Sequence, residues 1–516
     1  MTDEPILVMK GIKKSFGTNA ALQDVNFTLA VREIHGLLGG NGAGKTTLMN
    51  ILFGLYRVDS GEIILRGKRV DIHSPKDAIR LRIGMVHQQF LQIKSFSVLQ
   101  NVVLGTSVKN KFRLNLAEEE KKVRELSAHF GLDVDPQALI EDLPMGVRQK
   151  VEILKALYRG VEILILDEPT TNLTPQEVDG LFQSLRVMVK EGMSIVFITH
   201  KLREVLSVCD RISVLRNGNN VMTLKREESS EEAFVRGMVG EELDLQSSVV
   251  FSKGGLEESV QMVGQNIVLQ LDQVQLLNEE GRSLIKGITF EIREGEIFGV
   301  AGVADNGQKE LAEVILGIQP ASSGCVRLYG NTITHKPTSD LLESGISYIP
   351  EDCLRDGFLP KASVAQNLIL GFHKQKPYSR NGFMDLNAIL NAARGLISDY
   401  NIKTQGPTDT GANLSGGNIQ RVVVSRAFSR PCKLLVAHNP TRGLDIPSID
   451  FVYSRLLQNK KNGMATLLIS ENLDELLLLC NRIAVLYRGE VVGVLDRAHL
   501  EKYEIGRMMS GVRTDA

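Results

Sequence analysis

The stretch that decides the fold lies near the N-terminus and reads Gly39-Gly40-Asn41-Gly42-Ala43-Gly44-Lys45-Thr46-Thr47. It matches the pattern G-x-x-x-x-G-K-[ST], and it stands between an apolar run at 34–38 and a helical pattern at 48–52. Glycines let successive backbone N–H groups point at phosphate oxygens, and the start of a helix adds a favourable dipole. The stretch therefore predicts a phosphate-binding loop between a buried strand and a helix.

A second apolar run, 163–166, ends in the acids Asp167 and Glu168. Two acids after a strand are also common at the start of a helix, so their interpretation depends on the loop upstream. With that loop present, Lys45 is predicted to contact the β- and γ-phosphates of ATP, and Thr46 to ligate Mg²⁺. Asp167 is predicted to hold Mg²⁺ through its water shell, and Glu168 to polarise the attacking water. ATP and Mg²⁺ are the expected cofactors.

The chain repeats itself once over its length. Cys209-Asp210-Arg211-Ile212-Ser213-Val214-Leu215 returns as Cys480-Asn481-Arg482-Ile483-Ala484-Val485-Leu486, and each half alternates short apolar runs with helical patterns. Apolar runs between helices predict an α/β fold with a mostly parallel sheet flanked by helices in each half. We expect one domain at 1–245, a polar linker at 246–266 and a second domain at 267–516.

The composition narrows the functional class. The 516 residues carry a formal net charge of −1, which gives no sign of a nucleic-acid partner. The five cysteines form no C-x-x-C pair, so neither a zinc site nor a disulfide framework is expected. The N-terminus does not read as a secretory signal, and no uninterrupted apolar run reaches the roughly 18 residues of a membrane-spanning helix. A membrane process would need partner chains for the membrane part.

Motif order and spacing in both halves, across nearly the whole chain, resemble the ATPase domain of ABC transporters. The resemblance implies two tandem P-loop NTPase domains, each with a small antiparallel β subdomain and a helical subdomain. It also implies three further site residues. Gln88 matches the Q-loop glutamine near Mg²⁺ and the water, His200 matches the switch histidine at the γ-phosphate, and Phe16 matches the aromatic that stacks on adenine.

The second half has lost the residues that the reaction needs. Its loop reads Gly302-Val303-Ala304-Asp305-Asn306-Gly307-Gln308-Lys309, so Gln308 replaces the lysine. An amide lacks the full positive charge that phosphoryl transfer requires, and Lys309 lies one helical position, about 100°, further round. His438 and Asn439 replace the two acids, while Glu351, Glu471 and Leu277 replace the glutamine, the histidine and the aromatic.

The signature sequences show the opposite pattern. The second half has Leu414-Ser415-Gly416-Gly417-Asn418, close to the family's LSGGQ, whereas the first half has Pro144 and Met145 at the corresponding place. Proline also starts helices well, so Pro144 has an ordinary structural explanation. The family pairs its halves head to tail, which implies that Ser415, Gly416, Gly417 and Asn418 complete the nucleotide site of the first half. The substitutions in the second-half loop and in the first-half signature then fall in one and the same nucleotide site, which is degenerate.

The fused layout resembles the importer ATPases for simple sugars of the ribose and galactose type, and Val151 to Gly160 looks closer to the nucleoside branch. The resemblance implies two transmembrane permease subunits, an extracytoplasmic solute-binding protein and a peripheral position on the cytoplasmic face of the inner membrane. The solute could be a nucleoside, a sugar or a flavin-like molecule.

The main alternative is a soluble twin-ATPase translation factor. Such proteins usually keep both sites intact, carry a long charged linker and have an excess of basic residues. This chain differs in all three respects. A DNA-repair ATPase would be expected to contain clustered cysteines of the zinc-binding type, which this sequence lacks. A non-catalytic regulatory subunit would not need the intact phosphate-binding and acidic residues around Lys45 and Glu168.

Overall fold

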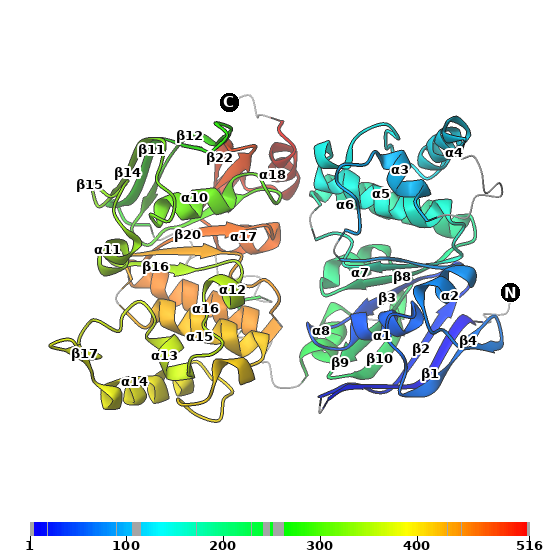
Figure 1. The fold of residues 1–516 in the computed structure, drawn as a ribbon, viewed down its shortest axis with the longest axis horizontal. Coiled ribbons are helices and arrows are strands. Elements are labelled where there is room, and N and C mark those ends of the chain that lie inside the picture. The colour runs from blue at the N-terminus through cyan, green and yellow to red at the C-terminus, as the bar shows by residue number, and fades with distance from the viewer. Residues whose placement is uncertain are drawn as a thin grey trace. The chain divides into compact units, whose positions relative to one another are not determined.

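A computed structural model describes residues 5–17, 19–88, 90–105, 115–171, 173–228, 230–240, 248–250, 263–430, 432–444 and 446–512. The chain forms two compact units, Met1–Leu243 and Asp244–Ala516, each with its own sheets and helices (Figure 1). Most of the predicted linker, 246–266, lies outside the described residues. Within it, Ser248 is buried in the second unit and donates a hydrogen bond to Asp450 at 2.7 Å.

The first unit is built on two sheets. The antiparallel sheet has the order β2-β1-β4-β5, with β1 Pro5–Phe16, β2 Asn19–Ala30, β4 Ser60–Leu65 and β5 Lys68–Val70. The larger sheet has the order β10-β9-β3-β8-β7-β6 and is parallel except for β10, with β3 Ile34–Leu38, β6 Ile83–Val86, β7 Ile163–Asp167, β8 Ser194–Thr199, β9 Arg211–Arg216 and β10 Asn219–Lys225.

Helices of the first unit connect these strands. They are α1 Lys45–Leu52, α2 Pro75–Arg80, α3 Val98–Val103, α4 Leu116–His129, α5 Met145–Tyr158, α6 Pro175–Lys190, α7 Leu202–Val208 and α8 Glu231–Val239. Helices α3, α4 and α5 contact one another and form the helical subdomain that the resemblance implied. Capping boxes at Ser97 and Thr174 fix the starts of α3 and α6.

The second unit repeats this plan. Its antiparallel sheet β12-β11-β14-β15 comprises β11 Ile267–Leu277, β12 Ser283–Arg293, β14 Ser323–Leu328 and β15 Asn331–Thr332. Its larger sheet β16-β19-β20-β13-β21-β22 comprises β13 Ile297–Ala301, β16 Ile346–Ile349, β19 Leu434–His438, β20 Ala465–Ser470, β21 Arg482–Tyr487 and β22 Glu490–Asp496, with only β22 antiparallel. A short hairpin adds β17 Ser379–Arg380 and β18 Phe383–Met384.

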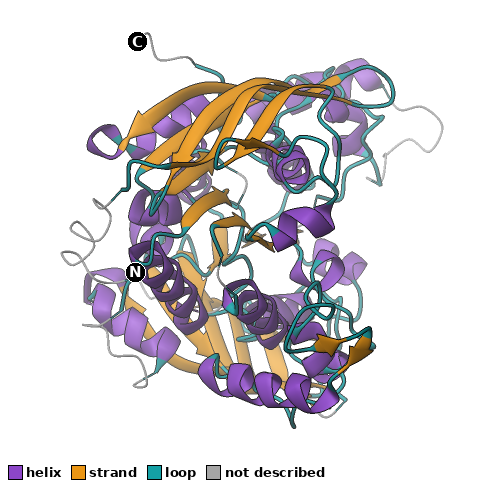
Figure 2. Cartoon of the chain, turned by 90° about the vertical axis from the view of Figure 1, so that its left-hand side faces the viewer, coloured by secondary structure: helices purple, strands orange, loops and turns teal. Residues whose placement is uncertain are grey.

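Helices pack against these sheets of the second unit (Figure 2). They are α10 Gln308–Ile315, α11 Thr338–Glu343, α12 Cys353–Asp356, α13 Val364–Leu368, α14 Leu386–Asp399, α15 Gly416–Phe428, α16 Ile446–Lys461, α17 Leu473–Leu479 and α18 Lys502–Met509. The α/β fold predicted from the sequence, with a parallel sheet in each half, is confirmed.

Parallel strands place the functional loops of the first unit along one edge. Strands β3, β7 and β8 are buried over their whole length, as the apolar runs predicted. They lie side by side, with β3 next to β8 and β8 next to β7. Because all three run in the same direction, the segments that follow Leu38, Asp167 and Thr199 leave the sheet at the same edge.

Candidate functional site

Glycines allow the backbone conformation of the phosphate loop in the first unit, and the lysine at its end hydrogen-bonds back to the loop. Gly44 stands at the start of α1 with φ +102°, and a Cβ there would lie 2.8 Å from the carbonyl oxygen of Ala21. The buried Lys45 ammonium donates hydrogen bonds to the carbonyls of Gly39 at 2.8 Å and Gly40 at 2.9 Å. Burial lowers the pKa of Lys45, although Glu168 and Asp167 oppose that shift.

A cavity of about 540 Å³ opens above this loop. Phe16 stands at its side, 46% exposed, with its ring in edge-to-face contact with Tyr56 at 5.2 Å. An exposed aromatic face beside a phosphate loop suits a flat base. The predicted residues that line the cavity are Phe16, Asn41, Gly42, Ala43, Gly44, Lys45, Thr46, Thr47, Gln88 and Glu168.

Two oxygen donors meet at the inner end of the loop. The hydroxyl of Thr46 donates to Oδ1 of Asp167 across 3.4 Å. Burial raises the pKa of Asp167 to about 6, with Glu168 adding to the rise while Thr46 and Lys45 oppose it. Hydroxyl and carboxylate oxygens are the ligands that Mg²⁺ prefers, so this pair fits the predicted metal.

Glu168 is held by two neighbours. Its backbone has φ +48°, an uncommon conformation for a side-chain-bearing residue. The Nε2 group of Gln88 donates to Oε2 of Glu168 at 3.1 Å, and Nδ1 of His200 lies 2.9 Å from Oε1. Burial alone would raise the pKa of Glu168, but the hydrogen bond and charge of His200, together with Lys45, lower it overall. The carboxylate is thereby kept ionised at neutral pH, as a group that orients water must be.

In the second unit, an amide fills the corresponding loop. Gln308 is buried, and its Nε2 group donates to the carbonyl of Val303 at 2.9 Å. Its Oε1 atom accepts from the backbone N–H of Asn306 at 3.0 Å. Lys309 turns away toward Glu313 on its own helix, with 3.7 Å between the charged atoms. Among the described residues of the second unit, the Gln308 amide therefore takes the place that the Lys45 ammonium holds in the first.

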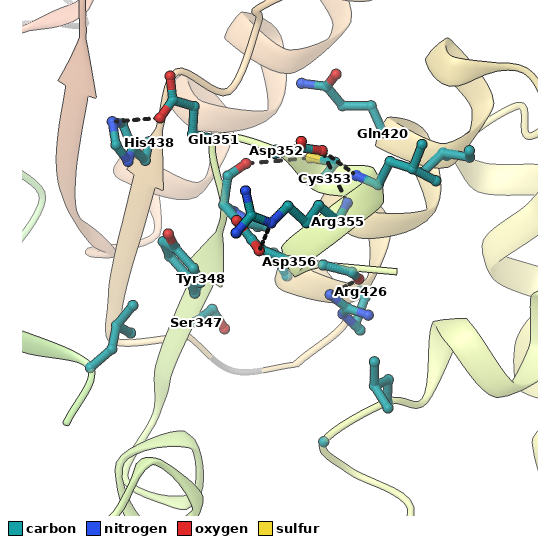
Figure 3. A pocket seen from close by; sticks show the side chains of 18 of the residues that line it. Ser347, Tyr348, Glu351, Asp352, Cys353, Arg355, Asp356, Gln420, Arg426 and His438 are labelled. Atoms are coloured by element: carbon teal, nitrogen blue, oxygen red, sulfur yellow. Dashed lines mark hydrogen bonds and ion pairs between the residues drawn. The ribbon is translucent and has the colours of Figure 1, made fainter. Parts of the chain in front are cut away.

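The amide and the carboxylate have also changed places in the second unit. Asn439, at φ +44°, donates from Nδ2 to Oε1 of Glu351 at 3.2 Å and accepts from the backbone N–H of Glu471 at 3.0 Å. Arg442 also binds Glu351. His438 lies 3.7 Å from the same carboxylate (Figure 3). Burial is the main cause that lowers the pKa of His438. The Glu351 carboxylate, which corresponds in place to the Gln88 amide, is thus already bound by Arg442.

The two signature sequences both start long helices. Ser415 precedes α15, and its hydroxyl accepts a hydrogen bond from Nδ2 of Asn418 at 2.8 Å instead of capping the helix. A Cβ added at Gly416 or Gly417 would meet no other atom within 4 Å, so the backbone there is open. Pro144 precedes α5 in the same way but offers neither a hydroxyl nor an N–H group.

One wall of this cavity is formed by residues that no sequence motif indicated. Asn217 and Gly218, in the turn between β9 and β10, line it together with Ala20, Ala21 and Gln23. Gly218 donates to the carbonyl of Ala43 at 3.1 Å and accepts from Gln23 at 2.7 Å. The Asn217-Gly218 pair indicates a turn, but nothing in the sequence placed that turn against the phosphate loop.

The sequence pattern of the family described as ABC transporter matches residues 22–171 and 285–442, once in each unit. The chain belongs to the ABC transporter family. Like other ATP-binding members of that family, it binds and hydrolyses ATP.

Curated relatives of this ABC protein match over almost their whole length. The nucleoside import ATP-binding protein NupA of Lactococcus lactis is 40% identical, with 99% of both chains covered. The guanosine import ATP-binding protein NupO of Bacillus subtilis is 37% identical, with 98% of both chains covered. The glucose import ATP-binding protein TsgD13 of Haloferax volcanii is 38% identical, covering 99% of this chain and 96% of the relative.

Proposed function

We propose that this chain is the ATP-hydrolysing subunit of an importer for a small polar solute, a nucleoside or a simple sugar. The single observation that carries the ATPase part is the assembly of Lys45, Thr46, Gln88, Asp167, Glu168 and His200 along one sheet edge of the first unit. The import part is supported by full-length similarity to import ATP-binding proteins, of which the nucleoside proteins NupA and NupO favour a nucleoside.

In the proposed reaction, the backbone N–H groups from Gly40 to Thr46 and the Lys45 ammonium bind the phosphates of ATP, and Phe16 stacks on the base. Thr46, Asp167 and Gln88 would hold Mg²⁺, which neutralises charge on the phosphates when bound. Glu168 orients the attacking water, and His200 contacts the γ-phosphate. Ser415, Gly416, Gly417 and Asn418 are proposed to bind the γ-phosphate of the nucleotide held by the first unit.

The second unit is proposed to contribute no hydrolysis of its own. Gln308 supplies no positive charge to a transition state, and both the amide of Asn439 and the carboxylate of Glu351 are used in internal hydrogen bonds. ATP binding would bring the units together, and hydrolysis at one site would reset the transporter.

The partners are proposed to be membrane-spanning permease subunits and an extracytoplasmic solute-binding protein, with the chain bound at the cytoplasmic face of the membrane. No helix among the described residues is long and apolar enough to cross a bilayer.

A pair of matched variants tests the one-site proposal. Glu168→Gln should lower ATP turnover of the full chain about 100-fold or more while ATP still binds, because only the group that orients water is lost. Asn439→Ala, at the corresponding position of the second unit, should leave turnover within about 3-fold, well short of the loss expected for a catalytic base. Equal losses in both variants, at matched thermal stability, would contradict the proposal.

Transport is tested by reconstituting the chain with its permeases in vesicles. A panel of nucleosides and simple sugars, each presented with the solute-binding protein, should contain one class that stimulates ATP turnover and is taken up. Stimulation by ribosomes in place of any solute would instead favour the translation-factor alternative.

A further inference from the structure

One carboxylate joins the two loops that carry the proposed reacting groups of the first unit. Glu204 lies on α7, and its Oε1 accepts a hydrogen bond from the hydroxyl of Thr170 at 2.6 Å. Its Oε2 accepts from the hydroxyl of Thr199 at 3.0 Å. Thr170 lies two residues after Glu168, and Thr199 immediately precedes His200. Glu204 itself does not line the nucleotide cavity.

The hydroxyl of Thr199 is fixed from both sides. It donates to Glu204 and accepts from the backbone N–H of Lys201 at 3.0 Å, so it spans the turn that holds His200. The loop after β7 is tied in a similar way, because the hydroxyl of Thr171 donates to the backbone carbonyl of Glu168 at 3.1 Å. The Lys201 ammonium lies 3.2 Å from Glu204 and balances its charge.

We propose that Glu204 is a positioning residue for ATP hydrolysis, which holds the Glu168 loop and the His200 turn in register. The 2.9 Å contact between Glu168 and His200 joins two segments that leave neighbouring strands, and the bridge through Glu204 is a further side-chain connection between them. A carboxylate suits this task because both of its oxygens accept hydrogen bonds and neither needs a donor.

The second unit holds the same bridge without the reacting groups. Glu475 on α17 accepts from Thr441 at 2.8 Å and from Ser470 at 2.5 Å, and the hydroxyl of Ser470 accepts from the backbone N–H of Asn472 at 3.0 Å. Burial raises the pKa of Glu475, and its hydrogen bonds with Ser470 and Thr441 oppose the rise. There the bridged loops carry Asn439 and Glu471. The chain thus contains its own control, in which the bridge can act only on structure.

The experiment compares Glu204→Gln with Glu475→Gln in the full chain. Each change keeps the shape of the side chain and replaces one acceptor oxygen with a donor. Glu204→Gln should lower kcat about 10- to 100-fold, as expected for a small misplacement of reacting groups, with KM for ATP changed less than about 3-fold because the phosphate loop is untouched. Glu475→Gln should leave kcat within about 3-fold, since no reacting group follows its bridge.

The split between kcat and KM separates positioning from stability. With kcat normalised to the fraction of folded protein, a loss of stability alone would leave both constants unchanged, whereas misplaced reacting groups lower kcat and leave KM for ATP nearly unchanged.

A hydroxyl pair provides the same comparison if either glutamine variant fails to fold. Thr199→Val should lower kcat, whereas Thr199→Ser should retain it, because a serine hydroxyl, that of Ser470, makes the same hydrogen bond in the second unit. Ser470→Ala should leave kcat unchanged. Equal kcat in Glu204→Gln and Glu475→Gln, or in the Thr199→Val and Ser470→Ala pair, overturns the proposal, as does a fall in kcat for Glu204→Gln that disappears once kcat is normalised to the folded fraction.

This inference rests on the roles proposed for Glu168 and His200, and Glu168→Gln serves as the reference. If Glu168→Gln retains turnover, the proposed site is wrong. If it loses turnover while Glu204→Gln does not, only the positioning role is wrong.

Discussion

At the scale of single residues, corresponding positions of the two units exchange an amide and a carboxylate. Gln88 donates to Glu168 in the first unit, whereas Asn439 donates to Glu351 in the second. The hydrogen bond between the two loops is therefore retained while the carboxylate moves from the strand end to the other loop. Arg442 then binds that displaced carboxylate. The second unit thus keeps the contact between the two loops, while the carboxylate proposed to orient water in the first unit is replaced by an amide.

The contrast between Lys45 and Gln308 predicts the effect of Lys45→Gln. Gln308 shows that a glutamine can satisfy the hydrogen bonds of such a loop, so the variant should fold with nearly unchanged thermal stability. Turnover should fall about 100-fold or more because an amide cannot stabilise the charge of the transferred phosphoryl group. Full activity with tight ATP binding in Lys45→Gln would contradict the proposed site.

Asp167 predicts a pH dependence of stability. Because its pKa of about 6 in the folded chain exceeds the ordinary value of 3.8, the free energy of unfolding is larger when the carboxyl is protonated and falls as pH rises from about 4 to 6. Without nucleotide, Asp167→Asn should therefore stabilise the chain at pH 7 by on the order of 1–3 kcal/mol, and much less near pH 4.

Denaturant unfolding at both pH values measures this difference. A stabilisation by Asp167→Asn that is equal at pH 4 and pH 7 would be inconsistent with a raised pKa.

At the scale of elements, α5 and α15 correspond but begin differently. Each follows a short 3-10 turn, at Ile140–Asp142 or Gly411–Asn413, and packs against a neighbouring helix of its subdomain. Pro144 is the N-cap residue of α5 as Ser415 is of α15, and neither side chain caps its helix by a hydrogen bond. The difference between the two starts concerns the groups they present rather than the helices that follow.

The correspondence predicts that Ser415→Pro leaves α15 folded but impairs the reaction. Circular dichroism and the thermal midpoint should change little, since Pro144 occupies the same place before α5. ATP turnover should fall about 100-fold, because the hydroxyl and the N–H group proposed to bind the γ-phosphate are both lost. The reciprocal Pro144→Ser should leave turnover nearly unchanged, and a loss of activity there would contradict the assignment.

At the scale of the whole molecule, each unit has a hydrophobic core of its own. One buried cluster, which includes Leu37, Leu48 and Ile165, belongs to the first unit, and two clusters around Val423 and Leu311 belong to the second. Units with separate cores are expected to fold independently. The division of labour between one active and one degenerate site can therefore be tested on the units themselves.

We predict that residues 1–243 alone fold and bind ATP with an affinity close to that of the full chain. Their ATP turnover should be at least about 10-fold lower, because the proposed Ser415 turn belongs to the other unit. Adding residues 244–516 at high concentration should restore part of it. Full turnover by the first fragment alone, measured where it stays monomeric, would rule out a contribution from the second unit.

The sequence by itself determined the repeated α/β architecture and the phosphate loop, and it predicts the loss of chemistry in the second half. A fully buried parallel strand appears in the sequence as an uninterrupted apolar run, which makes it recognisable. Asp167 and Glu168 directly follow one such run, and Lys45 ends the glycine loop that follows another. The roles of Gln88, His200 and Phe16 came from resemblance alone, since an isolated glutamine, histidine or phenylalanine carries no local signal.

Only the tertiary structure decided which distant side chains meet. Glu168 meets Gln88 and His200, and Glu204 bridges their loops, although these residues come from separate segments of the chain. The turn at Asn217 and Gly218 likewise reaches the cavity from a distant segment. The hydrogen bonds of Gln308 within its own loop depend on its side-chain conformation. Strand order sets these neighbours, because parallel strands such as β7 and β8 bring their following loops to one edge. The spacing of residues along the chain does not encode that order.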